Sequence, residues 1–247
     1  MTGETRSMDS SHEHTPTMAA EHPCGGQRRG RTIAVVGGTG PQGRGLAYRF
    51  ALAGDQIILG SRDAGRAQEK ACDINAKLAE PRVSGSTNAD AVRRSDLVLL
   101  AVPWEGHADL VASLAEELAG KIVISCVNPL GFDQDGPFGL VLEESAAQET
   151  QRLVPTARVV GAFHHVAALS LWRSPTPLSH EDVLVCGDDD EAKSVVRELA
   201  ASVTGKPGLD AGALRLARQL EPLTAVLISI NKRYKTRSGV AVTGIEA

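Results

Sequence analysis

A glycine-rich turn between a predicted strand and a predicted helix constrains this fold more than any other feature of the sequence. An apolar, β-branched run at 32–36 comes first, and glycines follow at positions 38, 40 and 43. We expect Gly38 to permit a tight turn, Gly40 to let the backbone approach a pyrophosphate, and Gly43 to let the helix pack closely on the strand. The free N–H groups and the positive end of the helix dipole would then bind the anion. The turn therefore predicts a dinucleotide site, and the alternative is a glycine-rich turn that binds nothing.

Apolar segments alternate with helical patterns along the chain from Arg31 onward. We expect strands at 32–36, 56–59, 97–102, 121–127, 158–162 and 182–186, and helices at about 43–53, 63–79, 105–119, 143–153, 190–203 and 211–234. Because these strands are apolar without alternation and are separated by helices, they should be parallel and covered on both faces. The pattern predicts an α/β fold with a Rossmann-type, doubly wound parallel sheet. The last helix is mostly apolar, so it should pack in a core or against another subunit.

The first 30 residues differ from the rest of the chain. They contain no Ile, Leu, Val or aromatic residue, so they cannot bury enough apolar surface to offset the entropy of ordering. We expect 1–30 to be a disordered tail that is neither a signal peptide nor a transit peptide. Its histidines at 12, 14 and 22 are only a weak indication of metal binding.

Composition excludes several classes of protein. The formal net charge of −4 lacks the basic excess of a protein that binds nucleic acid or a membrane surface, and eight aromatic residues are too few for a base-stacking platform. No apolar run approaches the 18 residues that span a bilayer. The four cysteines are widely separated, which predicts no zinc site and fits a reducing cytoplasm. The acids at 188–190 precede a predicted helix, so we expect helix capping there rather than a metal site.

The end of the second predicted strand indicates which dinucleotide is bound. An NAD site normally carries an acidic residue here, which accepts a hydrogen bond from the ribose 2′-hydroxyl. This chain has Ser61 and Arg62 instead, and Arg66 follows one helical turn later. A guanidinium can bind a phosphate through two parallel hydrogen bonds. We therefore predict NADP rather than NAD, with Thr39 as a further neighbour of the 2′-phosphate and with a solvated helix charge as the alternative role for Arg66.

The loops after the other strands should complete a ligand crevice, because the carboxyl ends of parallel strands meet at one edge of a sheet. We expect Val102 and Pro103 beneath the nicotinamide ribose and Asn128 in the equivalent place one strand further on. His107 either contacts the nicotinamide ribose or is a capping or solvated residue. The segment 163–168 follows the sixth predicted strand, and its alanines would let a flat ring approach closely.

Five motifs occur in one order along the chain: glycines 37, 38, 40 and 43 with Thr39, the segment 60–62, the segment 102–105, the segment 186–190 and the segment 209–212. With these motifs the chain resembles the NADPH-dependent reductases of the 8-hydroxy-5-deazaflavin coenzyme F420, over nearly all of 31–247. The resemblance implies an oxidoreductase that transfers a hydride directly between NADP(H) and coenzyme F420. It also implies a homodimer with an NADP-binding Rossmann domain at 31–163. A smaller C-terminal α/β part at 164–247 would close the deazaflavin crevice and form the dimer interface.

The resemblance also assigns residues to the two substrates. The positions implied for cofactor binding, together with those predicted above, are Gly38, Thr39, Gly40, Pro41, Gln42, Gly43, Ser61, Arg62, Arg66, Val102, Pro103, Asn128 and Ala168. His164 is the candidate for positioning the deazaflavin ring through a hydrogen bond, and the alternative is a histidine that supports the loop. We expect His165 to be structural.

Direct hydride transfer needs no protein nucleophile and no acid–base pair, and the sequence offers no evident catalytic dyad. Two other functions stay open: an NADP-dependent dehydrogenase or imine reductase of a small organic substrate, and a non-enzymatic NADP-responsive regulator. The last helix ends in a basic cluster at 232, 233, 235 and Arg237. These cations either stabilise the negative end of the helix dipole or steer the anionic tail of the deazaflavin. The segment 239–245 should form a short strand or an arm that approaches the ring.

Overall fold

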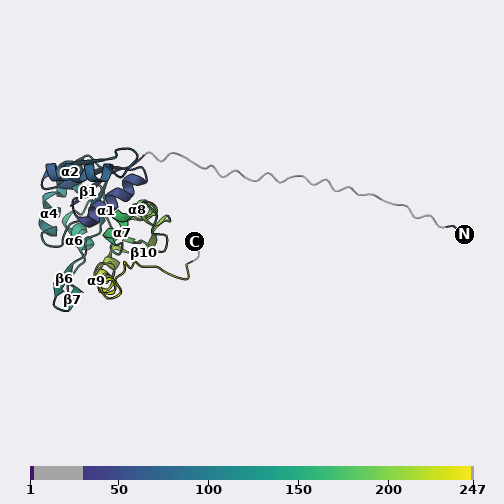
Figure 1. The fold of residues 1–247 in the computed structure, drawn as a ribbon. Helices are drawn as coiled ribbons and strands as arrows, with labels where there is room; N and C mark the ends of the chain where they lie inside the picture. The colour runs from purple at the N-terminus through teal and green to yellow at the C-terminus, as the bar shows by residue number, and fades with distance from the viewer. Residues whose placement is uncertain (3–29, 246–247) are drawn as a thin grey trace.

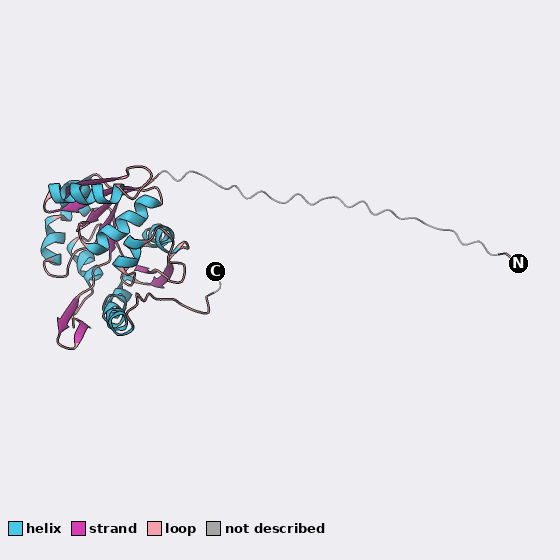
Figure 2. Cartoon of the chain, viewed as in Figure 1, coloured by secondary structure: helices cyan, strands magenta, loops and turns pink. Residues whose placement is uncertain are grey.

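One eight-stranded sheet with helices on both faces forms the body of the protein (Figures 1 and 2). The computed structural model describes residues 1–2 and 30–245, so the predicted tail at 1–30 lies almost entirely outside the described residues. The strands are β1 (Thr32–Val36), β2 (Gln56–Ser61), β3 (Val83–Thr87), β4 (Leu97–Leu100), β5 (Ile122–Ser125), β6 (Leu130–Asp133), β7 (Gly136–Gly139), β8 (Arg158–Gly161), β9 (Leu184–Gly187) and β10 (Leu209–Gly212). The helices are α1 (Pro41–Leu52), α2 (Ala64–Asn75), α3 (Asn88–Arg93), α4 (His107–Ser113), α5 (Ala115–Leu118), α6 (Ala146–Leu153), α7 (Ala168–Arg173), α8 (Asp190–Thr204) and α9 (Ala217–Tyr234), with a 3₁₀ turn at Leu214–Leu216 before α9.

The strand order of the sheet is β10-β9-β8-β5-β4-β1-β2-β3. The six strands from β8 to β3 are parallel, which confirms the predicted doubly wound α/β class. The expected parallel direction of the strand at 182–186 is wrong, because β9 runs antiparallel to β8 and β10 is parallel to β9. An unbroken apolar run shows that both faces of a strand are covered, but burial is the same for either strand direction.

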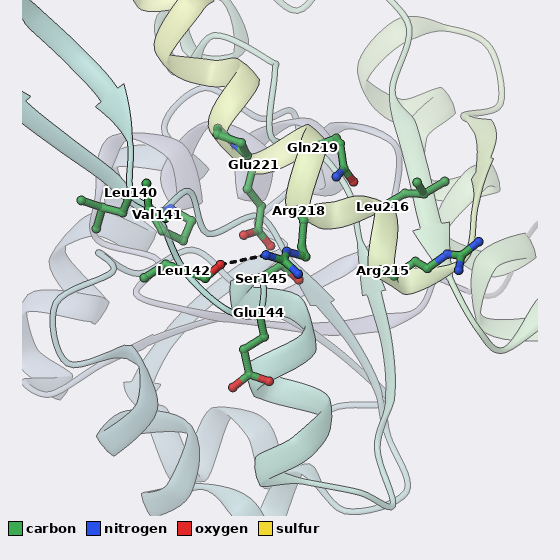
Figure 3. A pocket seen from close by; sticks show the side chains of 12 residues that line it. Leu140, Val141, Leu142, Glu144, Ser145, Arg215, Leu216, Arg218, Gln219 and Glu221 are labelled. Atoms are coloured by element: carbon green, nitrogen blue, oxygen red, sulfur yellow. Dashed lines mark hydrogen bonds between the residues drawn. The ribbon is translucent and has the colours of Figure 1, made fainter.

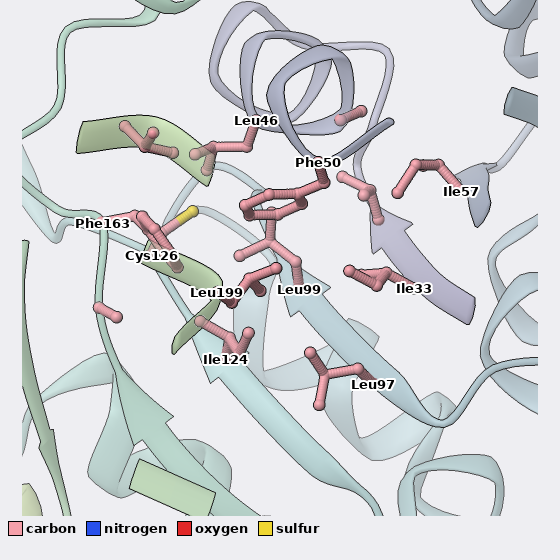
Figure 4. Close-up of a cluster of buried hydrophobic side chains, with 14 of the residues drawn as sticks. Ile33, Leu46, Phe50, Ile57, Leu97, Leu99, Ile124, Cys126, Phe163 and Leu199 are labelled. Atoms are coloured by element: carbon pink, nitrogen blue, oxygen red, sulfur yellow. The ribbon is translucent and has the colours of Figure 1, made fainter. Parts of the chain in front are cut away.

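Alternate residues of each strand feed two separate cores. Ile33, Leu97 and Leu99 face a cluster with Leu46 and Phe50 of α1 (Figure 4). Ala34, Val36, Val98 and Leu100 face the opposite cluster, which contains Val111 of α4 and Ala146 of α6. The chain therefore leaves β1 for one face of the sheet and leaves β4 for the other. The connections that follow these two neighbouring strands therefore diverge at the carboxyl ends, which is where an open α/β sheet forms its ligand crevice.

Four parts of the chain described below differ from the elements expected from the sequence. Strand β3 has one buried residue, Val83, and so lacks the apolar run that identified the other strands. The antiparallel hairpin of β6 and β7 lies outside the main sheet beside α9, and Asp133 holds its turn by accepting from the N–H groups of residues 135 and 136. The helix expected at 211–234 begins later, at Ala217, because β10 extends to Gly212, whose φ of +97° does not continue into a helix. The helix expected at 105–119 is divided in two at Leu114.

The C-terminal segment after α9 is an extended arm at the edge of the molecule and not a strand (Figure 1). Its residues 239–245 have no strand assignment. The arm is attached at Asp182, whose N–H donates to the carbonyl of Val240 (2.7 Å) and whose Oδ2 accepts from the N–H of Val242 (2.8 Å). Among the described residues, no helix combines the length and the apolar character that a membrane span requires.

Candidate functional site

The glycine turn places α1 in close contact with β1. The tight turn expected at Gly38 has its left-handed residue one position earlier, at Gly37, with φ of +74°. Gly38 is required by space instead, since a Cβ there would lie 2.8 Å from the Leu59 side chain. At Gly43 a Cβ would lie 2.9 Å from the Cα of Gly38. The predicted close helix–strand packing at Gly43 is therefore confirmed.

The first turn of α1 is arranged to receive an anion. Gly40 is its N-cap residue, Pro41 occupies the first helical position, and no side chain caps the helix. A Cβ at Gly40 would approach only the carbonyl of Gly37, at 3.5 Å, so the space above the turn is open. An uncapped helix N-terminus with its N–H groups and positive dipole end fits the pyrophosphate of a dinucleotide.

The end of β2 lies beside this turn, because the N–H of Gly38 donates to the carbonyl of Gly60 at 3.1 Å. Ser61 is buried and accepts from the N–H of Asp63. The carboxylate of Asp63 caps α2 by accepting from the N–H groups of residues 65 and 66, so it is already engaged and does not substitute for the acid of an NAD site. The Arg62 and Arg66 side chains are exposed, and within residues 30–245 neither forms an ion pair or side-chain hydrogen bond. Both guanidinium groups are free to bind a phosphate.

A crevice of about 630 Å³ lies over the carboxyl ends of β1, β4, β5 and β8. Its lining residues are Gly40, Pro41, Gln42, Ala101, Val102, Pro103, Cys126, Asn128, His164, His165, Val166, Ala167, Ala168, Leu169, Thr224, Leu227, Ile228, Asn231, Thr236, Arg237 and Ser238. The structure thus brings together eight residues predicted from the sequence, at positions 40, 41, 42, 102, 103, 128, 164 and 168. The predicted residues at 38, 39, 43, 61, 62 and 66 do not line this crevice. Gly38 and Gly43 lie in the packed turn, and the others follow the β1 and β2 edge.

Three contacts with Asn128 and Thr224 hold His164 in place. Asn128 donates from Nδ2 to the His164 carbonyl (3.3 Å), and Thr224 of α9 donates to the same carbonyl (3.0 Å). The Oδ1 of Asn128 lies 3.0 Å from His164 Nδ1, so the proton of the imidazole is on Nδ1. The other ring nitrogen, Nε2, is buried and has no hydrogen-bond partner among the described residues. Burial, and secondarily His165, lowers the pKa of His164 to about 3, so the imidazole is neutral.

Two other histidines are structural. His165 is buried, and its Nε2 lies 2.6 Å from the carbonyl of Leu220. His107 is also buried, and its ring nitrogens contact Glu149 Oε2 (2.7 Å) and the Thr150 hydroxyl (3.2 Å) of α6. The alternative of a capping or solvated His107 is therefore wrong, because the side chain is buried and makes no cap hydrogen bond. His107 also does not line the crevice, and its contact with the nicotinamide ribose stays a prediction. The position next to a crevice loop gave no indication of burial against α6.

Several contacts that shape the crevice were missed from the sequence. Phe163, at the bend after β8, has a φ of +64°, which is unfavourable for a residue with a side chain. Its ring packs edge-on against Phe50 at 5.7 Å, and its carbonyl accepts from Gln42 Nε2 at 3.3 Å. The bend is thus tied to the core below and to the glycine turn beside it. No local pattern in the sequence indicates a left-handed phenylalanine.

The acidic run at 188–190 caps α8, as expected. Asp189 accepts from the N–H of Ala192 at 2.7 Å, and Asp190 pairs with Lys193 at 3.1 Å. Asp188 accepts from the N–H of Leu214 at 2.9 Å. Each carboxylate therefore has a structural partner.

A second cavity, of about 550 Å³, lies at the start of α9 (Figure 3). Arg218 crosses it and donates to the carbonyl of Leu142 at 2.9 Å. At its base the buried carboxylate of Glu221 accepts from the N–H groups of Ala146 (2.9 Å) and Ala147 (3.1 Å), at the start of α6. Burial raises the pKa of Glu221 to about 7, although the two N–H groups oppose the shift.

A family model, two curated relatives and a solved structure name the same kind of protein. Residues 32–129 match the family model described as NADP oxidoreductase, coenzyme F420-dependent. The F420-dependent NADP reductase of Methanocaldococcus jannaschii is 38% identical over 222 residues, which cover 87% of this chain and 99% of that protein. The F420-dependent NADP reductase of Methanothermobacter thermautotrophicus is 35% identical and covers 86% of this chain and 95% of its own. A crystal structure from Arthrobacter sp. FB24, of a candidate F420-dependent NADP reductase, has a TM-score of 0.73 at 31% identity, covering 86% of this chain and all of that one.

The position of Arg62 leads to a test of dinucleotide preference. Replacing Arg62 by Ala should weaken binding of NADPH about 10- to 100-fold, because a charge-assisted contact with the 2′-phosphate is lost. Binding of NADH, which lacks that phosphate, should change less than about twofold. Titration of both dinucleotides against wild type and Arg62→Ala measures this. Arg152→Ala, which removes an exposed guanidinium on α6, is the control, and equal losses for NADPH and NADH would exclude 2′-phosphate binding by Arg62.

The raised pKa of Glu221 leads to a prediction about stability. The folded chain holds the Glu221 proton up to about pH 7, and the unfolded chain releases it near 4.5. Between these values the folded state binds more protons, so the Glu221 contribution to the free energy of unfolding falls as pH rises. Chemical denaturation at pH 5 and pH 8 measures the free energy of unfolding of both proteins. From pH 5 to pH 8 the value for Glu221→Gln should rise by about 2 kcal/mol relative to that of the wild type. Parallel pH profiles of the two proteins would refute the assignment.

Proposed function

The chain belongs to the family of coenzyme F420-dependent NADP oxidoreductases, and on that premise we propose how its crevice serves the reaction. The protein transfers a hydride between NADP(H) and the 8-hydroxy-5-deazaflavin coenzyme F420. The crevice of about 630 Å³ carries this conclusion. It joins the glycine turn to a wall of small residues at Ala167 and Ala168 and to α9, so two flat rings have room beside each other.

We propose that NADP lies along the edge from β2 to β8. The uncapped turn at 38–43 would bind the pyrophosphate, and Ser61, Arg62 and Arg66 with Thr39 would bind the 2′-phosphate. Val102, Pro103, Asn128 and Ala168 would contact the nicotinamide half. The hydrogen bond between Gly38 and Gly60 supports this arrangement, because it puts the two phosphate-binding regions on neighbouring strands.

The substrates supply the hydride chemistry, since the nicotinamide C4 and the deazaflavin C5 exchange the hydride directly. The residues of this chain hold the two rings at near-attack distance and keep water away from them. The alanines at 167 and 168 leave the ring face unobstructed, and Val102 and Ile228 supply apolar walls.

We propose that His164 acts by positioning the loop at 164–168. The burial of its free nitrogen and its contacts with Asn128 and Thr224 support this loop-supporting alternative over a hydrogen bond to the ring. A neutral imidazole also has no proton to give at physiological pH, apart from the one shared with Asn128.

We also propose a homodimer formed by the C-terminal part at 164–247 together with the β6–β7 hairpin. Large apolar side chains are exposed there: Phe132 (69%), Phe138 (44%), Val226 (52%) and Tyr234 (70%). The hairpin packs on α9, where a Cβ at Gly139 would lie 2.5 Å from the Pro222 Cβ. A shared apolar surface on two packed elements is typical of a subunit interface.

We propose the cytoplasm as the location of the protein. Three free thiols support it, at Cys72, Cys126 and Cys186. The fourth cysteine, Cys24, lies outside the described residues.

A direct assay tests the proposed reaction. Purified protein with NADPH and oxidised F420 should bleach the visible absorbance of the deazaflavin, with one NADPH consumed per F420 reduced. Reactions without protein and with NADH are the controls. Absence of bleaching by folded, NADPH-binding protein would refute the function. NADPH oxidation by a cyclic imine would then favour the small-substrate reductase, and tight NADPH binding without turnover of either compound would favour a regulator.

The dimer has its own test. Sedimentation of the wild-type protein should give twice the chain mass, and the double variant Phe132→Asp, Val226→Asp should give the mass of one chain, because two carboxylates cannot be buried unpaired in an apolar interface. Leu52→Asp places the same charge on an exposed apolar residue of α1 and should leave the dimer intact. A monomeric wild-type protein at micromolar concentration would refute the interface.

A further inference from the structure

Arg237 is the one permanently charged residue among those that line the crevice in the described part of the chain. The other lining residues are apolar, small or neutral polar, with no aspartate, glutamate or lysine. Arg237 itself is exposed, and within residues 30–245 it forms no ion pair or side-chain hydrogen bond. An unpaired guanidinium at the mouth of a neutral crevice is arranged to receive an anionic group of a ligand.

The chain turns sharply after α9 to bring Arg237 to this position. Lys235 takes a left-handed conformation with φ of +51° and ends the helix. The side-chain oxygen of Asn231, one turn earlier, then accepts from both the N–H (2.5 Å) and the hydroxyl (2.9 Å) of Ser238. These bonds fold the residues after α9 back along the helix and fix the backbone on one side of Arg237.

A second attachment fixes the chain just beyond Arg237. Asp182 bonds to the backbone of Val240 and Val242, as described above, and its Oδ1 accepts from Lys206 at 2.6 Å. Gly239 passes close to Glu181, where a Cβ would overlap the carboxylate group. Arg237 therefore projects from a segment held at both ends.

The neighbouring cations do not share this position. Lys232 and Arg233 line a different cavity, together with the hairpin residues 135–137 and Val226. The basic cluster at the end of α9 is therefore divided, and only Arg237 lies at the crevice.

The anionic groups of NADP already have sites elsewhere in the proposed arrangement. The pyrophosphate fits the uncapped start of α1, and the 2′-phosphate fits Arg62 at the end of β2. Arg237 comes from the segment after α9, which is a different part of the crevice lining from the glycine turn with Gly40 and Gln42. A cation on this segment, separate from both proposed NADP phosphate sites, matches the second substrate.

We propose that Arg237 binds the acidic side chain of the deazaflavin substrate, its phosphate and carboxylate groups, and so selects the complete coenzyme over the bare ring system. This inference rests on the proposed function. The alternative source of an anion for Arg237 is the NADP pyrophosphate, and the two differ in which substrate is affected when the guanidinium is removed.

The test compares Arg237→Gln with wild type and with Arg233→Gln, which removes the same charge four residues earlier. Equilibrium fluorescence titration gives the Kd of each protein for F420 and for an 8-hydroxy-5-deazaflavin that carries the ribityl chain without phosphate. Steady-state assays give KM for F420 and for NADPH. Arg237→Gln should raise Kd and KM for F420 about tenfold. It should change values for the phosphate-free deazaflavin and for NADPH less than about twofold, and Arg233→Gln should behave as wild type.

The outcomes separate the inference from the function on which it rests. Wild-type protein that neither binds nor reduces F420 would overturn both. Wild-type turnover with unchanged F420 binding by Arg237→Gln would overturn the Arg237 assignment alone. An equal loss for both deazaflavins, or a loss for NADPH, would also overturn it. Asn231→Ala tests the attachment of the segment. Alone it should cause part of the loss of F420 affinity seen in Arg237→Gln, and combined with Arg237→Gln it should cause no further loss. A full additional loss of affinity in the double variant would overturn the positioning role of Asn231.

Discussion

The close approach of α1 to β1 at Gly43 is the contact on which the rest of the site depends. A single added carbon there would lie 2.9 Å from Gly38, so the helix could not start where it does. That start sets the height of Gly40 and Gln42 above the carboxyl ends of the strands. Gln42 then donates to the carbonyl of Phe163, which fixes the bend that leads into the loop at 164–168. A packing constraint between two backbones is thereby passed to the crevice loop at 164–168.

Helix α9 supports another part of the crevice lining through one polar stripe. Glu221, Thr224 and Asn231 lie on the same face of the helix, since they are separated by near-multiples of a helical turn. Each bonds to a different segment: Glu221 to the start of α6, Thr224 to His164, and Asn231 to the residues after the helix. The opposite face carries Val226 and Arg233 beside the hairpin. One helix thus joins the crevice on one side to an exposed apolar surface on the other.

The sequence was sufficient where function depends on backbone shape and was insufficient where it depends on side chains that meet from distant segments. The turn at Gly38 to Gly43 could be recognised because a close backbone approach excludes every other residue type. The direction of β9 could not, because burial on both faces does not depend on direction. The partners of His107 and Glu221 lie 42 and 75 residues away in the sequence, and no local pattern encodes such distances. Arg237 was visible only as one of several basic residues near a helix end, a place where cations occur for reasons of the helix dipole alone.

The distribution of charge around the crevice has a consequence for the reaction. Arg237 lies at the crevice, Arg62 lies outside it at the end of β2, and the crevice histidines are neutral because burial lowers the pKa of both His164 and His165. A carboxylate beside the nicotinamide would stabilise the positive, oxidised ring, and a cation would disfavour it, by an amount that grows as water is excluded. A neutral centre adds neither bias. In the proposed arrangement the protein binds its substrates through their phosphates at the periphery and leaves the relative stability of the two redox pairs to the substrates themselves.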